Sequence, residues 1–523
     1  MKKQTIYAAI LSGLVMTTTA CTDNYKEYNT NPYEANKEQM SYDAYNIRAA
    51  IVGMEGYIVP VDVNMSQFME CLLGGSFGGY LADSNQGFYG KNYATYNPQQ
   101  HWIQVAFNDI IPNIYKNLAQ LKQVTDDPTF LAVGNIIKVA AVHRITDIYG
   151  PIPYSKIGED GKLETAYDTQ EEVYNTMFAE LDDAINVLTP MRTSNFSANA
   201  DKIFSGNTEK WIRFANSLKL RLAMRIAYVN VDLAKQKAEE VMAHEIGPML
   251  TNDDCAFNNV AESPFRVVMY DYNGGDSRVS ADITSYMNGY NDPRREKYFT
   301  QSTFTEEDLN TQENGYYGLR SGIQIPTSDL CHKYANMNIA SGPNKLLLMN
   351  AAETAFLRAE GAMRGWNMGD TAENLYNEGI RLSFQQWGAQ GANQYLLDDS
   401  LKPMKYVDLA NAANNGTDVS TITVKWDDAA DMEQKLERII TQKWIANFPL
   451  GIEAWSDYRR TGYPMLMKAL SNLSNGVVST ERMARRLPYP QREYTENTVN
   501  VQAAVSSLGG PDNMATPVWW DAK

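Results

Sequence analysis

The chain has 523 residues, and its 62 acidic and 46 basic side chains give a formal net charge of −16. Nucleic acid is excluded as a partner, because neutralising its phosphates requires a clustered surface of Lys and Arg. A multi-helix membrane protein is also excluded, since the mean hydropathy is −0.42 and no apolar run reaches the ~20 residues that span a bilayer. With 44% hydrophobic and 21% charged residues, the chain is expected to fold around a large buried core.

The first residues predict secretion and a lipid anchor. Two lysines precede an apolar stretch, residues 6–16, and a cleavage region of small side chains, residues 18–20. Cys21 follows directly, which is typical of a bacterial lipoprotein whose new N-terminal cysteine is acylated; the alternative is an ordinary secretory signal with an incidental cysteine. Acyl chains, at ~0.8 kcal/mol per buried CH₂, hold a protein on a membrane without crossing it. We therefore expect a signal peptide over residues 1–20 and lipidation of Cys21.

Residues 21–40 are polar and lack apolar periodicity, so they predict a tether between the anchor and a single domain over residues 41–523. Beyond the tether the chain contains Cys71, Cys255 and Cys331. An odd number of cysteines in an exported protein cannot be fully disulfide-bonded, so the stability of the domain must come from packing.

Apolar residues recur with helical spacing in the first half of the domain. One such helix covers residues 133–148 and ends at the Gly150-Pro151 pair. Thr169, with Glu172 three residues later, is a capping signal for the next helix. Two further helices are expected over residues 211–226 and 232–244.

A second pair of helices is expected near residues 346–366 and 370–388, where small and apolar residues fall close to tetratricopeptide spacing. Helix pairs in both halves predict a mainly α fold, a tetratricopeptide-like helical-repeat scaffold in which each pair buries a face on its neighbours. Segments rich in Asn, Gly, Tyr and Asp interrupt this scaffold. Because long loops are usually functional, we expect loop-rich insertions that build one surface, near residues 74–100, 251–345 and 391–428.

Residues 74–78 read Gly-Gly-Ser-Phe-Gly and match the pattern of a hydrolase nucleophile elbow, with Ser76 as the nucleophile. Such an elbow needs a strand before the serine and a helix after it, whereas residues 66–73 look helical or mixed and Gly79 opens a loop. We favour a glycine-rich turn that lets the backbone approach a ligand or a helix. A surface serine hydrolase is kept as the alternative.

The histidines and cysteines do not form a metal-binding motif, because Cys331 and His332 are adjacent and the others are widely spaced. No cofactor is therefore expected. Structural calcium on the acidic pairs Asp398-Asp399 or Asp427-Asp428 is the alternative, since oxygen ligands suit that ion. Solvated loop charges are the simpler interpretation of these pairs.

Tyrosine is abundant, with 32 Tyr against 16 Phe, and many of these rings fall in the loop-rich segments. A sugar presents an apolar CH face and a rim of hydroxyls, so a glycan site combines flat aromatic side chains with Asp, Asn and Arg. Peptide capture would use the same groove through Asn and Asp side chains that bond backbone amides. The predicted ligand-binding residues are Tyr80, Asp83, Asn85, Phe88, Tyr89, Asp271, Tyr272, Asn273, Arg278, Tyr316 and Tyr317.

Other prominent residues are expected to be structural. Trp211 fits the apolar face of a helix, and the Trp, Asp and Arg side chains of residues 455–460 fit an internal brace. Trp519 and Trp520 are expected to anchor the C-terminal tail onto the domain.

Longer segments in a fixed order carry a further signal. They are NTNP (29–32), residues 74–88, EKWIRFANSLKLRLAMR (209–225), NDPRREKYF (291–299), AETAFLRAEGAMRG (352–365), WSDYRRTGYP (455–464) and TPVWWD (516–521). Together with the lipoprotein start, these segments resemble the SusD/RagB-like nutrient-binding outer-membrane lipoproteins of the Bacteroidetes. The resemblance covers nearly the whole chain, so it is more specific than any short motif.

The resemblance implies a SusD-like fold built on helix pairs and displayed on the outer surface of the outer membrane. It implies a SusC-like TonB-dependent β-barrel transporter as the partner, over which the lipoprotein closes like a lid. Members of the family bind oligosaccharides or peptides and catalyse no reaction. The leading expectation is thus a surface lipoprotein that captures an oligosaccharide and delivers it to the transporter. The alternatives are a peptide-binding protein and a purely gating lid subunit.

Overall fold

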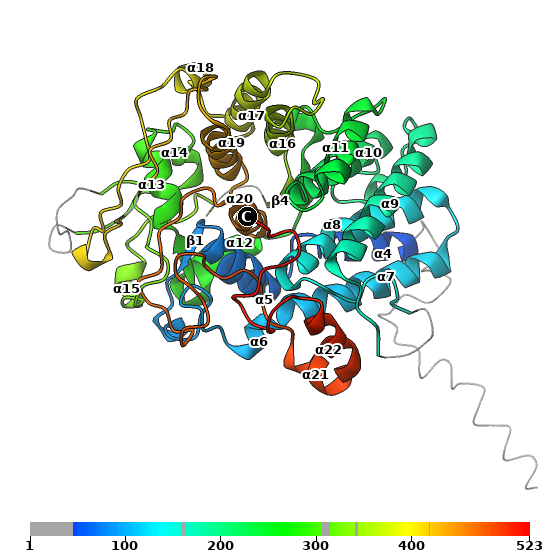
Figure 1. The fold of residues 1–523 in the computed structure, drawn as a ribbon, viewed down its shortest axis with the longest axis horizontal. Coiled ribbons are helices and arrows are strands. Elements are labelled where there is room, and N and C mark those ends of the chain that lie inside the picture. Colours follow the sequence, from blue (N-terminus) through cyan, green and yellow to red (C-terminus); the bar gives the residue numbers. More distant parts are fainter. Residues whose placement is uncertain (1–44, 159–163, 306–313, 340–343, 418) are drawn as a thin grey trace, which may run out of the picture.

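A computed structural model describes residues 45–158, 164–305, 314–339, 344–417 and 419–523. The predicted signal peptide, the lipidation site Cys21 and the tether up to residue 40 lie outside the described residues. Helices dominate and the described strands are short, so the mainly α prediction is confirmed (Figure 1). Within the described ranges, no helix is both long and apolar enough to span a membrane.

Long helices packed in pairs form one half of the scaffold. Helix α4 packs on α7, α8 on α9, and α10 on α11 (Figure 1). Helix α10 also packs on α9, which joins two of the pairs. Stacked pairs bury a continuous core, as the helical-repeat prediction required. The bounds are α4 Tyr45–Glu55, α7 Ile111–Val124, α8 Pro128–Tyr149, α9 Gln170–Leu188, α10 Thr208–Arg225 and α11 Val231–Ala243.

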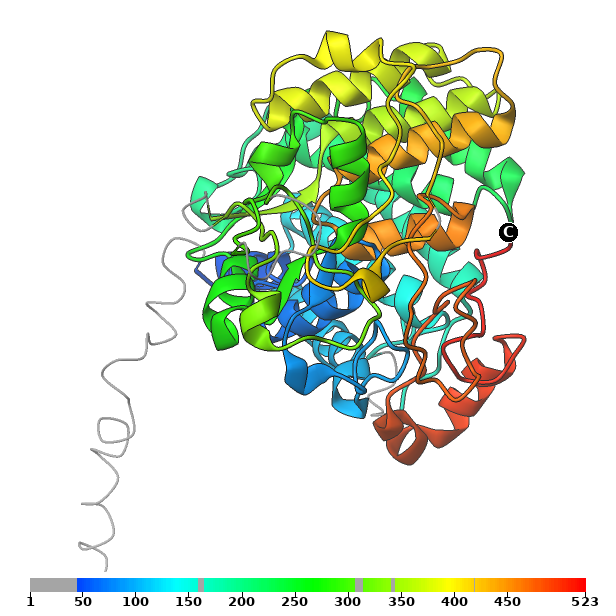
Figure 2. The same ribbon diagram turned by 90° about the vertical axis from the view of Figure 1, so that its left-hand side faces the viewer.

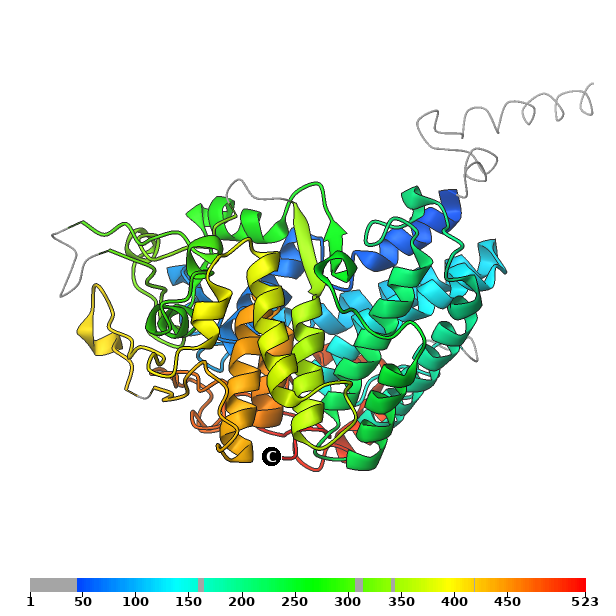
Figure 3. The ribbon, with the colours of Figure 1, turned by 90° about the horizontal axis from the view of Figure 1, so that it is seen from above.

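The other half contains the second predicted helix pair, α16 and α17, with α19 packed against both (Figure 3). The predicted start near residue 346 is wrong, because Lys345–Met349 forms strand β4. The helix begins after Asn350, whose side chain accepts the backbone N–H of Glu353 at 2.7 Å. The bounds are α16 Ala351–Met363, α17 Ala372–Gln386, α19 Met432–Ala446 and α20 Gly451–Thr461.

The loop-rich segments gather on one side of the scaffold, at the left of Figure 1 and facing the viewer in Figure 2. Strand β1 (Leu81–Asp83) pairs antiparallel with β3 (Ser277–Val279) and so joins the first insertion to the second. Strand β2 (Ala256–Asn259) pairs with β4. Several short helices also form within these loop-rich insertions and elsewhere. They are α5 Val63–Ser66, α6 Gln100–Ile103, α12 Pro264–Arg266, α13 Ala281–Gly289, α14 Arg295–Tyr298, α15 Ser328–Cys331, α18 Ala392–Leu396, α21 Gln491–Glu496 and α22 Thr498–Ser506.

Two predicted helix boundaries are confirmed. Thr169 caps α9, because its hydroxyl accepts the Glu172 N–H at 3.3 Å while the Glu172 carboxylate accepts the Thr169 N–H at 2.8 Å. Gly150 follows α8 with a φ of 87°, a conformation that costs glycine little. Both boundaries depend only on neighbours within one turn.

The Gly-Gly-Ser-Phe-Gly segment packs closely against a helix. A π-helical segment, η2 (Gln67–Gly75), runs into Ser76 in place of a strand, and Ser76 is only 6% exposed, so the nucleophile-elbow interpretation is wrong. The glycines let η2 approach α20 closely. A Cβ on Gly74 would lie 2.8 Å from the Ile452 nitrogen, and one on Gly78 would lie 2.6 Å from the Gly451 oxygen. The favoured prediction is confirmed in the close approach of the glycines to a helix, but residues 74–77 are themselves helical and only residues 78–79 form a turn.

Charged side chains occupy the centre of the scaffold, where α8, α10, α16 and α20 meet. Glu453 of α20 lies 2.6 Å from Arg225 and 3.6 Å from Arg221, both on α10. Arg221 in turn donates two 2.8 Å hydrogen bonds to Glu353 of α16. Burial alone would raise the pKa of Glu453, but the guanidinium groups of Arg221 and Arg225 hold it well below its usual range. We call these residues the buried charge network.

The brace predicted in residues 455–460 extends this network. Arg460 donates hydrogen bonds of 2.6 and 2.8 Å to Glu360 of α16, and Asp457 accepts one of 2.5 Å from Lys443 of α19. Burial would raise the pKa of Glu360, but Arg460 and Arg364 lower it to about 2. The prediction of an internal brace is confirmed.

The tryptophan predictions also agree with the structure. Trp211 is fully buried, and Trp520 donates its indole N–H to the Asp147 carboxylate at 2.8 Å, which fixes the C-terminal tail. The three described cysteines are buried free thiols, so packing does stabilise this part of the chain.

Replacing Glu453 by Gln is expected to lower the free energy of unfolding by about 3–5 kcal/mol, because the two buried guanidinium groups of Arg221 and Arg225 each lose one of their two carboxylate partners. The control is E496Q, which removes the exposed partner of Arg492 and is expected to leave the free energy of unfolding nearly unchanged, because solvent screens such a pair. Urea denaturation followed by circular dichroism measures both variants. A midpoint for E453Q equal to that of the wild type would contradict the structural role of the network.

Candidate functional site

A groove of about 400 Å³ opens between η2, the first insertion and the turn before β3. A larger hollow of about 570 Å³ lies between α7 and α21, but it contains none of the predicted ligand-binding residues. The groove contains several of them and is therefore the candidate site. Its lining residues are Gln67, Phe68, Asn85, Gly87, Phe88, Lys91, Gln99, His101, Trp102, Tyr272, Asn273 and Asp276.

π-Helical segments flank this groove. Segment η2 carries Gln67 and Phe68, η4 (Ala106–Ile110) follows the helix that carries Trp102, and η8 (Val267–Asp271) ends just before Tyr272. A π-helical turn holds more residues than an α-helical turn and is frequent at functional sites. Gln67, Phe68, Trp102 and Tyr272, which these segments carry or adjoin, all line the groove.

Aromatic rings form one wall of the groove. The rings of Phe88 and Trp102 meet edge to face with centroids 5.1 Å apart. The ring centroid of Phe68 lies 5.5 Å from that of Trp102 and 5.7 Å from that of His101. Because Trp102 is only 3% exposed, it supports the rings that reach the surface. The wall is thus a preformed apolar surface that suits a flat apolar ligand face.

Three amide side chains form a polar wall of the groove, and all three bond one buried carboxylate. Asp276, 2% exposed, accepts the side-chain amide of Gln67 on Oδ2 at 2.7 Å. On Oδ1 it accepts the amides of Asn85 at 2.8 Å and Asn273 at 2.9 Å. Three amide side chains from three segments therefore converge on one acceptor.

Asp83 lies behind this wall, on β1, and is 5% exposed. Among the described residues, neither of its carboxylate oxygens has a hydrogen-bond partner. Burial, together with the negative charge of Asp276, raises the pKa of Asp83 to about 7. Asp83 has almost no exposed surface and does not line the groove, so the prediction that it contacts ligand directly is wrong.

The structure brings Asn85, Phe88, Tyr272 and Asn273 together in the groove, as the sequence analysis predicted for ligand-binding residues. Asn85 and Phe88 come from the first insertion, and Tyr272 and Asn273 come from the second. Their contact with a ligand stays a prediction.

The ligand-binding prediction is also wrong for two further residues, Tyr80 and Arg278. Tyr80 is fully buried, with its ring stacked on Trp444 and its hydroxyl bonded to the Trp444 carbonyl at 2.5 Å. Arg278 is 4% exposed and donates to the backbone carbonyls of Met269 and Gly274 at 3.0 and 3.1 Å, so it braces the turn before β3. The composition of a loop does not indicate which of its side chains turn inward.

The remaining predicted residues lie outside the groove lining. Tyr89 is 38% exposed, and Asp271 pairs with Arg266 at 2.6 Å. Tyr316 and Tyr317 are half-buried in the second insertion. Their roles in binding stay predictions.

The sequence analysis missed Gln67, Phe68, His101 and Trp102. His101 and Trp102 directly follow the first insertion, whose boundary was set at residue 100, so a wider boundary would have included them. Gln67 and Phe68 carried no signal, because the π-helical geometry of η2 breaks the apolar period.

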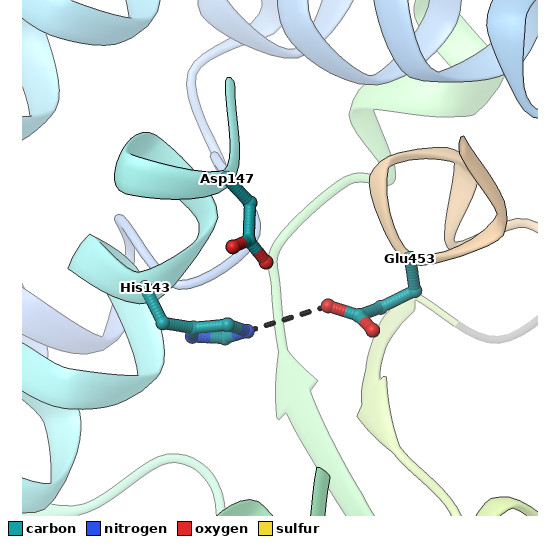
Figure 4. A group of neighbouring side chains, drawn as sticks. All are labelled: His143, Asp147 and Glu453. Carbon is teal, nitrogen blue, oxygen red and sulfur yellow. Dashed lines mark hydrogen bonds and ion pairs between the residues drawn. The ribbon is translucent and has the colours of Figure 1, made fainter. Parts of the chain in front are cut away.

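Among the residues that the structure describes, one buried group has metal-ligand chemistry: His143, Asp147 and Glu453, which face one another in the core (Figure 4). The His143 Nε2 atom lies 3.3 Å from Glu453. Arg225 lies 3.3 Å from Asp147 and 2.6 Å from Glu453, so a guanidinium group already pairs with both carboxylates. We therefore assign this group to the buried charge network.

The acidic pairs considered for calcium bond protein donors. Asp398 accepts backbone N–H groups of its own loop, and Asp399 pairs with Lys425 at 3.0 Å. Asp427 and Asp428 accept the Ala429 N–H and the Trp426 indole. These contacts are those of ordinary capped loops.

The fold and groove define a class, a helical-repeat protein with a preformed surface site for noncovalent binding. The SusD-like family model, described as Susd and RagB outer membrane lipoprotein, matches residues 27–521, and the chain belongs to this family. SusD-like proteins are nutrient-binding lipoproteins rather than enzymes. The predicted family and SusD-like fold are confirmed.

Solved structures agree with this assignment. A SusD homolog from Bacteroides uniformis is 49% identical, with a TM-score of 0.87, and the match covers 92% of this chain and 100% of that one. A chitin-binding SusD homolog from Flavobacterium johnsoniae is 40% identical, with a TM-score of 0.85, over 91% of this chain and 99% of that one. A SusD homolog from Bacteroides thetaiotaomicron is 40% identical, with a TM-score of 0.84, over the same shares. No curated protein sequence matches the chain.

The pKa of Asp83 predicts a pH-dependent stability. Because the native pKa of about 7 exceeds the ordinary value of 3.8, the folded state holds a proton that the unfolded state has lost, and stability falls as pH rises from 4 to 7. D83N removes this penalty. Its unfolding free energy relative to the wild type should rise by about 2–3 kcal/mol between pH 5 and pH 8.

Urea denaturation at the two pH values measures this difference. The control is D183N, at an exposed position on α9, which should keep a constant difference from the wild type. A constant difference for D83N would show that Asp83 does not titrate between these pH values.

Proposed function

We propose that this protein is a cell-surface lipoprotein that captures an oligosaccharide in the groove between η2 and Tyr272. The observation that carries the proposal is the pairing of an aromatic wall, Phe68 and Phe88 on Trp102, with a wall of fixed amides. Sugar rings have apolar CH faces that pack on aromatic rings and hydroxyls that bond amides. The groove is also open, which suits a chain that extends beyond the site.

The relatives support a glycan as the ligand. The Flavobacterium johnsoniae homolog is described as chitin-binding, and its similarity extends over 91% of this chain. N-acetylchitohexaose is therefore the first probe. Peptide capture is the second candidate, because the Gln67 and Asn273 amides can also bond a peptide backbone.

We further propose that the captured glycan passes unaltered to a SusC-like TonB-dependent transporter, with the protein outside the outer membrane on lipidated Cys21. Family membership supports the lipid anchor and the outer-membrane location. Detection of the transporter in a pull-down, with no ligand bound by the isolated protein, would favour a purely gating lid.

Replacing Tyr272 by Ala should weaken glycan binding by about 1–2 kcal/mol, roughly 5- to 30-fold, through the loss of one ring at the groove. Isothermal titration calorimetry against N-acetylchitohexaose and a panel of neutral and acidic hexasaccharides measures the affinity. The control is Y45A, because Tyr45 is 47% exposed on α4 and does not line the groove. Equal affinities of Y272A and the wild type for the glycan would show that this groove is not the binding site.

Replacing Cys21 by Ala should release the protein from the membrane, because acylation needs the thiol. Fractionation of the expressing cells, with protease treatment of intact cells, measures anchoring and exposure. T22A is the control and should remain membrane-bound. A C21A protein that stays in the membrane fraction would contradict anchoring through this cysteine.

A further inference from the structure

The Asp276 carboxylate is held rigidly beneath the groove. Its backbone N–H donates to the Val268 carbonyl at 2.9 Å, and its backbone carbonyl accepts the Ser84 N–H at 3.0 Å. Its side chain already accepts the amides of Gln67, Asn85 and Asn273. With 2% of its surface exposed, Asp276 has little opportunity to contact a ligand itself.

The orientation of the amides follows from this arrangement. An ionised carboxylate only accepts hydrogen bonds, so each amide must direct its NH₂ group toward Asp276 and its oxygen away. The Asn85 oxygen accepts the Gly87 N–H at 2.9 Å. The oxygens of Gln67 and Asn273 accept no hydrogen bond from the described residues. The polar wall therefore presents free acceptors in front of a buried negative charge.

We infer that Asp276 is a positioning residue that makes the groove selective for uncharged glycans rich in hydroxyl or acetamido N–H donors. This inference rests on the proposed function. A hydrogen-bond donor on the ligand bonds to the free amide oxygens. A carboxylate or sulfate has no donor for these oxygens and is repelled by the negative charge of Asp276. Acidic oligosaccharides are therefore rejected although the groove is wide enough for them.

Two basic side chains, Lys91 and His101, line the groove from exposed positions and would favour an acidic ligand. A lysine on a flexible exposed stem is strongly hydrated and gains little from a single ion pair. Asp276, in contrast, is desolvated and fixed by bonds from three segments. The buried charge is therefore expected to decide the preference.

Two variants test the inference. D276N cannot accept all three NH₂ groups, so at least one amide must turn. N273D changes one exposed partner without altering the core, and its φ of 52° is a conformation that Asp tolerates. The matched control is N374D on α17, because the exposed Asn374 amide bonds Asp370 at 2.8 Å in the same way but far from the groove.

The experiment is calorimetry on the full mature chain. The probes are N-acetylchitohexaose, cellohexaose, xylohexaose and mannohexaose as neutral glycans, and an oligogalacturonate hexamer and a chondroitin sulfate hexasaccharide as acidic ones. The wild type should bind its best neutral probe at least ten-fold more tightly than either acidic probe. D276N and N273D should each lose at least five-fold in affinity for that neutral probe, while N374D should not change.

Tighter binding of an acidic probe, lost in K91A, would overturn the inference and assign the preference to Lys91. Neutral binding that needs Tyr272 but is unchanged in both D276N and N273D would overturn the inference and leave the proposed function intact. If the wild type binds none of the probes, the proposed function fails and the inference fails with it.

Discussion

The buried ion pairs of Glu453 with Arg221 and Arg225 constrain how the helices of the scaffold can pack against one another. Charges buried at the meeting point of several helices are stable only when every partner is in place, since desolvation of an unpaired charge costs several kcal/mol. A shift of α10 relative to α20 by one turn would leave guanidinium groups without carboxylates. The network therefore restricts how the helix pairs can pack, which apolar contacts alone would not do.

Segment η2 connects the groove to this packed core. Glu70 of η2 accepts hydrogen bonds of 2.7 and 2.8 Å from Arg144 of α8, and the glycines at the end of η2 lie against the start of α20. Gln67 and Phe68, at the other end of η2, are thereby fixed to the core. A wall held in this way is ordered before a ligand arrives, which lowers the entropic cost of capture.

Sequence alone predicted what depends on neighbours within a turn or on long ordered segments. The Thr169 capping box, the end of α8 at Gly150 and the family itself belong to this group. The groove was only partly predictable, because contacts between distant segments decide it. Tyr80 and Tyr272 lie in similar loop-rich sequence, yet Tyr80 is buried with its ring stacked on Trp444, whereas Tyr272 is half-buried and lines the groove. The π-helical geometry of η2 likewise placed Phe68 off any regular period.

The β1–β3 pairing has a consequence for the whole domain. It holds together two chain segments so distant that Asn85 and Asp276, neighbours in the groove, are 191 positions apart in the sequence. Under the proposed function, a glycan bound across them would act as a noncovalent staple between remote parts of the polypeptide. At a concentration 100 times its dissociation constant, such a staple adds about 2.7 kcal/mol to the stability of the native state. Under the proposed function, the ligand-bound protein would thus resist thermal and proteolytic damage better than the ligand-free protein.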